Sequence, residues 1–217
     1  QKTDDATYIA DLYQTFLGRS CSAAEINSWK NVLSQGVSRT YLMAQFSAST
    51  EFGNLCTTNG ISRGSVTLTE ERDKHPGVAK MVVGCYQILG RSASGTEIES
   101  WVKKTVTNGS GADLVDGFFK SQEYLNKNTS NTQYVTDLYT TTLVRTPDSK
   151  GLSTWVSALE SGTSRDSVRN SFYESSEFKQ LCTKNGIAVK KNRYPKAAAV
   201  LNQVGWNLKA AFQWSAG

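Results

Sequence analysis

The chain has 217 residues, of which 38% are hydrophobic and 20% are charged, and its formal net charge is +5. This composition is typical of a globular protein that is long enough to bury one or two cores. The sequence contains no run of about 18 apolar residues, so we expect no membrane-spanning segment. Residues Gln1 to Asp5 do not form a signal peptide, and we expect any export signal to have been removed already.

One pattern occurs three times and predicts the architecture. Trp29, Trp101 and Trp155 each follow an arginine by ten residues, and each precedes a phenylalanine by 17 and a glutamate by 22. The arginines are Arg19, Arg91 and Arg145, the phenylalanines are Phe46, Phe118 and Phe172, and the glutamates are Glu51, Glu123 and Glu177. Ungapped agreement over this length indicates an internal duplication.

Each copy begins with an amphipathic helix. In the first copy the apolar residues have helical spacing and are Ile9, Leu12, Tyr13, Phe16 and Leu17. Residues 134–143 repeat this stripe, whereas the middle copy is weaker and carries Gly84 in place of a leucine. We expect Gly18 and Gly90 to end the helix with a left-handed residue, and Val144 predicts a different exit in the third copy.

Further helices follow in every copy. The second helix starts at a capping box in two copies, Ser22 to Glu25 and Ser94 to Glu97, and at Asp148 in the third. The starts of a third and a short fourth helix are indicated by serines, namely Ser38, Ser110, Ser164, Ser49, Ser121 and Ser175.

These elements predict an all-α fold of three tandem repeats, each with three to four helices, followed by a C-terminal helix. The expected boundaries are repeat 1 at 8–61, a polar linker at 62–78, repeat 2 at 79–133, repeat 3 at 134–187, and a basic tail with the C-terminal helix at 188–217. No acidic side chain follows Glu177, so the tail could contact a nucleic acid, an anionic lipid or an acidic polymer. A solvated domain end is the favoured interpretation, and we expect no nucleic-acid partner.

The four cysteines favour two disulfides in an exported protein over reduced core thiols, because an even count occurs in a chain rich in Ser, Thr and Asn. Three pairings are possible. Cys56 and Cys182 occupy equivalent positions, so we expect Cys21–Cys56 and Cys85–Cys182.

The repeated residues are interpreted as structural. Trp29, Trp101 and Trp155 lie on apolar stripes, which predicts core packing rather than sugar stacking. Each repeated arginine is expected to pair with the repeated glutamate of its own copy. Four aromatic residues that leave the main stripes are the weak candidates for ligand binding, although packing is the favoured interpretation for them too: Trp206, Trp214, Tyr41 and Tyr173.

No catalytic site is expected. His75 is the single histidine and lies in the predicted linker, so no triad can form. The loop at Asp148 has one acid where calcium needs several oxygen ligands. We therefore expect no metal, no cofactor and no enzymatic activity, with an unrecognised enzyme domain as the remote alternative.

Three segments resemble a known bacterial repeat, and they read LYQTFLGRS (12–20), ILGRSASGTEIESWV (88–102) and YVTDLYTTTLVRTPDSKGLSTW (134–155). Its pattern is LYxxxLGRxPDxxGLxxW followed by GFxxSxEF, and the family is catalogued as domain of unknown function 4214. The resemblance covers residues 8–61 and 79–187. Cys21 and Ala93 replace the usual proline, the first two copies lack the PD pair, and Val144 replaces a glycine.

The resemblance implies an extracellular, all-helical and non-catalytic module of a secreted or surface-attached bacterial protein, similar to phycobilisome linker domains. We expect it to attach its parent protein to glycans or host surface material. The alternative is an assembly or spacer module that contacts neighbouring protein domains.

Overall fold

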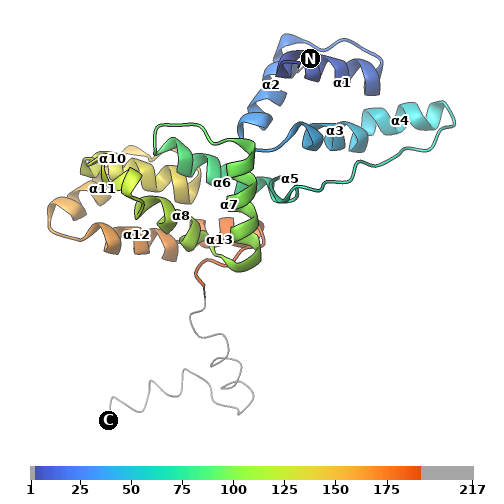
Figure 1. Cartoon of the computed structure of the whole chain (residues 1–217). Coiled ribbons are helices and arrows are strands. Elements are labelled where there is room, and N and C mark those ends of the chain that lie inside the picture. The colour runs from blue at the N-terminus through green and yellow to red at the C-terminus, as the bar shows by residue number, and fades with distance from the viewer. Residues whose placement is uncertain (1–2, 192–217) are drawn as a thin grey trace, which may run out of the picture.

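The computed structural model describes residues 3–191, and these residues form helices joined by loops, without a strand anywhere in that range. The prediction of an all-α fold is therefore confirmed (Figure 1). The predicted C-terminal helix and the tail beyond Lys191 lie outside the described residues.

The helices follow the three predicted copies, here called the first, second and third segments. The first segment contains α1 (Asp5–Leu12), the π-helical turn η1 (Tyr13–Leu17), α2 (Ala23–Ser34), α3 (Arg39–Ala48) and α4 (Thr50–Thr58). After α5 (Glu71–Lys74), the second segment contains α6 (Pro76–Gln87), α7 (Gly95–Asn108), α8 (Gly111–Phe119) and α9 (Gln122–Leu125). The third contains α10 (Asn131–Leu138), the π-helical turn η2 (Tyr139–Leu143), α11 (Ser149–Glu160), α12 (Arg165–Glu174) and α13 (Ser176–Lys184).

The predicted helix starts are confirmed by their caps. Ser22 Oγ accepts from the Glu25 amide at 3.3 Å while the Ser22 amide donates to Glu25 Oε2 at 2.8 Å, and Ser94 with Glu97 repeats this box. Asp148 Oδ1 accepts from the Gly151 amide at 2.8 Å. Side-chain caps of this kind stabilise a helix by about 0.5–2 kcal/mol each, so local sequence defines where these helices begin.

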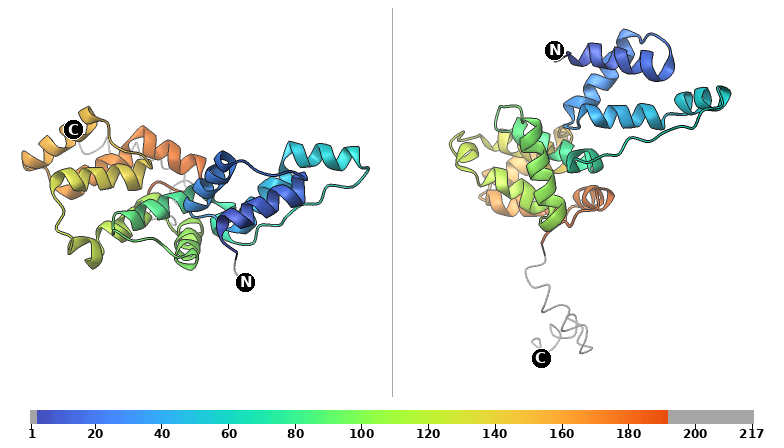
Figure 2. Two further views of the ribbon diagram at one scale, coloured as in Figure 1. Left: turned by 90° about the horizontal axis from the view of Figure 1, so that it is seen from above. Right: turned by 45° about the vertical axis from the view of Figure 1, so that its right-hand side comes forward.

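The buried residues form two separate cores. The first core lies inside the first segment and consists of Ile9, Leu12, Tyr13, Leu17, Val37, Leu42 and Phe46. The second and third segments share one core, here called the shared core, which runs from Val78 to Ile187. Figures 1 and 2 show the same division, with α1 to α4 as one body and α6 to α13 as another.

The predicted linker at 62–78 includes α5 and connects the two bodies. The buried Asp73 accepts from the Ser38 amide at 2.7 Å and from the Ser38 hydroxyl at 2.5 Å, so α5 caps the start of α3. Glu99 of α7 in turn accepts from the amides of Glu71 and Arg72, both at 2.9 Å. Hydrogen bonds therefore hold α5 to Ser38 of the first segment and to Glu99 of the second.

The spacing between the repeated tyrosine near the end of the first helix and the repeated arginine differs between segments by one residue. Tyr13 and Tyr139 each precede the repeated arginine by six residues and begin a π-helical turn, whereas Tyr86 precedes Arg91 by five and lies within the α-helix α6. A π-turn takes one additional residue, so all three tyrosines reach the same place beside the arginine. It follows that Cys85, and not Gly84, is the equivalent of Leu12, which corrects the comparison made from sequence.

Gly84 has a different role, at a crossing of two helices. A Cβ added to Gly84 would lie 2.9 Å from the carbonyl oxygen of Thr140 in η2. We expect Gly84→Ala to lower the free energy of unfolding by about 1–2 kcal/mol, because overpacking against a backbone atom outweighs the better helix propensity of alanine. Urea denaturation measures this. Gly64→Ala is the control, since its Cβ would meet nothing within 4 Å, and an equal loss in both variants would contradict the assignment.

The exit of the first helix was wrongly predicted for the third segment. Val144 has φ 55° and ψ 36°, the same left-handed conformation as Gly18 at φ 64° and Gly90 at φ 82°. For a β-branched residue this conformation is a genuine outlier and costs roughly 1–2 kcal/mol. The loop geometry required between the first and second helices therefore prevails over the preference of the residue.

The prediction of two disulfides is wrong, because Cys21, Cys56, Cys85 and Cys182 are free thiols. Cys85 is fully buried at the position that leucine takes in the other segments, so it acts as a small apolar side chain. Cys182 packs against Gly111, and burial raises the pKa of its thiol to about 11. An even cysteine count could not distinguish such packing from pairing.

Candidate functional site

Each segment contains the same cluster of a tyrosine, a phenylalanine, an arginine and a glutamate. The Tyr13–Phe46, Tyr86–Phe118 and Tyr139–Phe172 ring centroids lie 4.9, 5.0 and 5.1 Å apart, edge to face. The guanidinium carbons of Arg19, Arg91 and Arg145 lie 4.7, 4.5 and 4.9 Å from the centroids of the same tyrosine rings. The Nε atoms of these arginines donate to Glu51, Glu123 and Glu177 at 2.7, 3.0 and 2.7 Å.

The expected arginine–glutamate contact is therefore present in all three segments. Hydrogen bonds from Ser22 and Arg19 hold the pKa of Glu25 at about 2, and those from Ser94 and Arg91 do the same for Glu97. The side chains of these arginines are 41–43% exposed, so solvent screens these ion pairs. We assign the clusters to orienting helices within a segment, and not to binding a ligand.

The repeated tryptophans pack against their cores but remain half-buried. Trp29, Trp101 and Trp155 lie 5.1, 4.8 and 5.4 Å, between ring centroids, from Phe46, Phe118 and Phe172. Trp29 Nε1 also donates to the Tyr13 hydroxyl at 3.1 Å. Trp101 borders a hollow of about 420 Å³, but Lys104 Nζ lies 4.6 Å from its ring centroid and occupies that face. Lys104 and Phe118 therefore leave no open face of Trp101 for a sugar.

The candidate ligand-binding aromatics are not brought together. Tyr173 is buried and its hydroxyl donates to Asp116 Oδ1 at 2.6 Å, so its prediction as a binding residue is wrong. Tyr173 departs from the apolar stripe of its own segment because its side chain faces the second segment. Tyr41 is half-buried against the first core. Trp206 and Trp214 lie outside the described residues.

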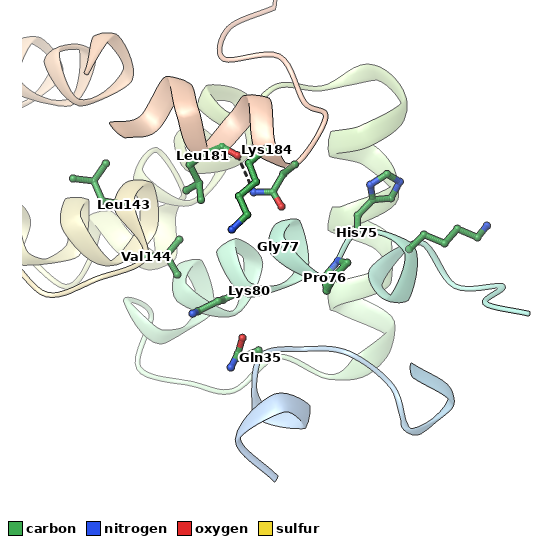
Figure 3. Close-up of a pocket in the computed structure, with 11 residues that line it drawn as sticks. Gln35, His75, Pro76, Gly77, Lys80, Leu143, Val144, Leu181 and Lys184 are labelled. Carbon is green, nitrogen blue, oxygen red and sulfur yellow. Dashed lines mark hydrogen bonds between the residues drawn. The ribbon is translucent and has the colours of Figure 1, made fainter. Parts of the chain in front are cut away.

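A groove lies where the three segments meet. It has a volume of about 660 Å³ and is lined by the end of α2, the start of α6, the end of η2 and the end of α13 (Figure 3). Its polar walls are Gln35, Lys74, His75, Lys80, Lys184 and Asn185, and its apolar walls are Pro76, Gly77, Leu143, Val144 and Leu181. No carboxylate, hydroxyl or thiol is among these residues, so the groove is cationic.

Local packing holds two sides of the groove together. Asn185 Nδ2 donates to the carbonyl of Leu181 at 2.8 Å, and its Oδ1 would lie only 1.7 Å from a Cβ on Gly77. A side chain at Gly77 would force Asn185, which follows α13, to shift away from the start of α6. The contact brings Lys184 of the third segment beside Lys80 of the second.

A second hollow of about 400 Å³ continues the groove and shares Gln35, Lys80 and Val144 with it. Asn31, Gln87 and Arg145 are among the other residues that line it, and this hollow too has no carboxylate. In Figure 3 the amino groups of Lys80 and Lys184 extend toward Val144. The strained Val144 therefore lies in the wall of both hollows.

The lining residues can bind polar and anionic groups. His75 Nε2 lies 3.5 Å from Glu71 Oε2, but no hydroxyl or thiol of the groove stands beside it as a nucleophile. Among residues 3–191 no group of three or more His, Cys, Asp or Glu side chains could hold a metal ion. The cations and amides can instead bind anionic and hydroxyl groups.

Comparison with known proteins gives one match. A family model described as Domain of unknown function (DUF4214) matches residues 1–56 and 124–182, more than half of the chain. The chain belongs to the DUF4214 family. No curated protein and no solved structure matches it.

The two DUF4214 matches include the segments that have a π-helical turn and leave out residues 57–123. The second segment, in which Tyr86 precedes Arg91 by five residues, falls largely in the part left out. None of the described helices of this DUF4214 chain is long and apolar enough to cross a bilayer.

Sequence reasoning missed the groove of the DUF4214 chain. Gln35, Lys80 and Lys184 come from three different segments and share no motif, so only the packing of the segments brings them together. One signal was present in the sequence, namely Val144 at a position where the other copies have glycine. A residue that breaks a local rule in this way is a reason to look for a functional site.

Proposed function

We propose that this chain is a non-catalytic, extracellular binding module of a secreted or surface-attached bacterial protein, and that it attaches its parent protein to glycans or host surface material. The observation that carries the proposal is the groove, which presents cations, amides and apolar side chains in one concave surface. Ligand sites combine apolar walls with a few polar groups in this way. The extracellular location rests on the family resemblance, since the cysteines are not paired.

The test is a glycan-array screen of the intact chain, with a mucin pull-down beside it. We expect binding that Gln35→Ala weakens about two- to tenfold, because one hydrogen bond contributes about 0.5–1.5 kcal/mol. Asn27→Ala is the matched control, since Asn27 is exposed on the same helix and does not line the groove. A chain that binds neither the array nor mucin would refute the proposal.

A second candidate function, assembly with neighbouring protein domains, is favoured by a comparison of α4 and α13. The two helices share the residues Glu-Phe, Leu-Cys-Thr and Asn-Gly-Ile at the same spacing. Their caps are the same, with φ −95° and ψ 6° at both Asn59 and Asn185. The backbone therefore has the same conformation at the ends of α4 and α13.

Their surroundings differ. In α13 the apolar face packs on the second segment, where a Cβ on Gly111 would lie 2.8 Å from Phe178, and the amide of Gly111 donates to the Ala188 carbonyl at 2.8 Å. In the third segment Leu181 and Ile187 are half-buried and buried, whereas their equivalents in the first segment, Leu55 and Ile61, are exposed by 39% and 59%. Two apolar side chains that are covered in the third segment are thus exposed in the first, although Cys56 of α4 is buried.

Sedimentation velocity of the purified chain tests this second candidate. It predicts self-association at high concentration that the double change Leu55→Ser and Ile61→Ser abolishes. A chain that stays monomeric at about 1 mM, where even contacts of about 4 kcal/mol are populated, would count against assembly between copies of this chain.

A further inference from the structure

We infer that the groove selects acidic glycans, with Lys80 and Lys184 pairing with the carboxylate or sulfate groups and Val144 supporting the apolar face of a sugar ring. This inference rests on the proposed function and specifies its ligand class. Three independent observations support it: the charge of the groove, the availability of its two central lysines, and the strained backbone at its wall.

The charge of the groove is of one sign. Lysines 74, 80 and 184 line the first hollow and Arg145 lines the second, and neither lining includes an acidic residue. A concave surface with charges of one sign raises the local concentration of oppositely charged ligands. Lys74 and Arg145 are already paired, with Glu71 at 2.9 Å and Glu177 at 2.7 Å. Lys80 and Lys184 are therefore the two lysines that remain for an anionic ligand.

Lys80 and Lys184 have available ammonium groups. Within residues 3–191 neither side chain makes a hydrogen bond or an ion pair with the protein, although 15 ion pairs occur over that range. Both extend toward the same wall of the groove (Figure 3). Two like charges directed at one space are unfavourable without an anion between them. An acidic group placed there would contact both.

Val144 adds the third observation. Its left-handed backbone, at φ 55°, would be unstrained with glycine, which the other two segments have at this place. A strained residue that persists points to a function for its side chain. The valine forms an apolar surface between the two hollows, close to Leu143 and Leu181. Carbohydrate rings have apolar faces that pack on such a surface.

The amides favour a glycan over an acidic polypeptide. Gln35 lines both hollows, and Asn31 and Gln87 line the second. An amide both donates and accepts, which matches sugar hydroxyls that also do both. Polyglutamate offers charge without ring faces or hydroxyl groups. It is therefore the probe that separates the two classes of acidic polymer.

The experiment measures binding of the full chain to four probes: heparin as a sulfated glycan, polygalacturonate as a carboxylated glycan, dextran as a neutral glycan, and polyglutamate. Binding is followed at about 0.1 M and 0.5 M salt, since screening separates ion pairing from other contacts. We expect binding to one or both acidic glycans, with polyglutamate and dextran at least about tenfold weaker.

The variant that tests the lysines is Lys80→Gln with Lys184→Gln. We expect it to lose at least about tenfold in affinity for the acidic glycan, because each lysine would contribute a charge-assisted hydrogen bond to the acidic group. Lys30→Gln with Lys150→Gln is the matched control, because it removes the same charge at exposed positions outside the groove. The control should change the affinity by less than about twofold.

Val144→Gly separates binding from folding. It should retain or raise the melting temperature, because it relieves the positive φ, and it should weaken acidic-glycan binding. Equal losses in both lysine pairs, unchanged binding in Val144→Gly, or polyglutamate binding as strong as that of the glycans would each overturn the inference. Dextran binding that the lysine pair does not affect would overturn it while leaving the proposed function intact. Absence of binding to all four probes, together with a negative array, would refute both.

Discussion

Replacing Asp116 with alanine is expected to lower the free energy of unfolding by about 3–5 kcal/mol, because it leaves a buried arginine with only the exposed carboxylate of Asp166 as its counter-charge. Arg169 has a side chain that is only 7% exposed, and its Nε donates to Asp116 Oδ1 at 2.8 Å. The same oxygen accepts from the Tyr173 hydroxyl at 2.6 Å. These contacts join α8 to α12 across the interface of the second and third segments.

The pKa shifts of Asp116 and Tyr173 agree with this structural role. Burial alone would raise the pKa of Asp116, but hydrogen bonds from Lys120 and Tyr173 and the charge of Arg169 outweigh it and hold the pKa below its ordinary value. Burial raises the pKa of Tyr173 well above its usual range, so its hydroxyl remains a donor. The Asp116 carboxylate therefore accepts hydrogen bonds from three side chains, those of Lys120, Tyr173 and Arg169.

Urea denaturation of two further variants makes the Asp116 prediction specific. Lys120→Ala removes only the contact of a lysine that is 60% exposed, so its effect should stay below about 1 kcal/mol. Asp116→Leu combined with Arg169→Met should be less destabilised than Asp116→Ala, because the buried charge is gone. A double variant that is less stable than the single one would contradict the mechanism.

Phe46→Ala is expected to destabilise the first segment by about 3–5 kcal/mol and to leave the other two largely folded. Phe46 is 3% exposed and contacts Tyr13, Phe16 and Trp29. It belongs to the first core, which has no buried residue in common with the shared core. The two bodies meet mainly through Asp73 at Ser38 and through Gly36, whose Cβ would lie 3.0 Å from Val83.

Hydrogen exchange measures this prediction residue by residue, because it reports local opening separately from global unfolding. In Phe46→Ala the amides of α1 to α3 should lose protection, while those of α6, α8 and α12 keep it. Phe172→Ala is the matched control, since Phe172 is 2% exposed and fills the equivalent place in the shared core. It should reduce protection in α6 to α13. Uniform loss in either variant would show that the chain unfolds as one unit.

Sequence predicted the local features of this fold well, because they depend on near neighbours along the chain. The capping boxes at Ser22 and Ser94 involve residues three apart, and the left-handed Gly18 and Gly90 follow from the absence of a Cβ. The predicted helices of the three copies are present in the predicted order, whereas α5 lies in the stretch that was predicted as a linker.

What sequence missed depends on contacts between segments. Arg169 and Asp116 are 53 positions apart, and nothing in either neighbourhood indicated that they meet. Tyr173 was named as a candidate ligand-binding residue because it departs from the stripe of its own segment, yet that departure directs it into the shared core. The groove is a product of the same packing, so its residues had no common signal.

The π-helical turns explain how the repeat tolerates a change in length. When one residue is absent between Tyr86 and Arg91, the helix tightens from π to α geometry and the aromatic ring still meets the guanidinium group. Insertions or deletions at this point are thereby absorbed within a single turn and do not propagate to the rest of the unit. Alignment profiles that permit a one-residue gap between tyrosine and arginine should consequently recognise additional copies of this repeat in other sequences.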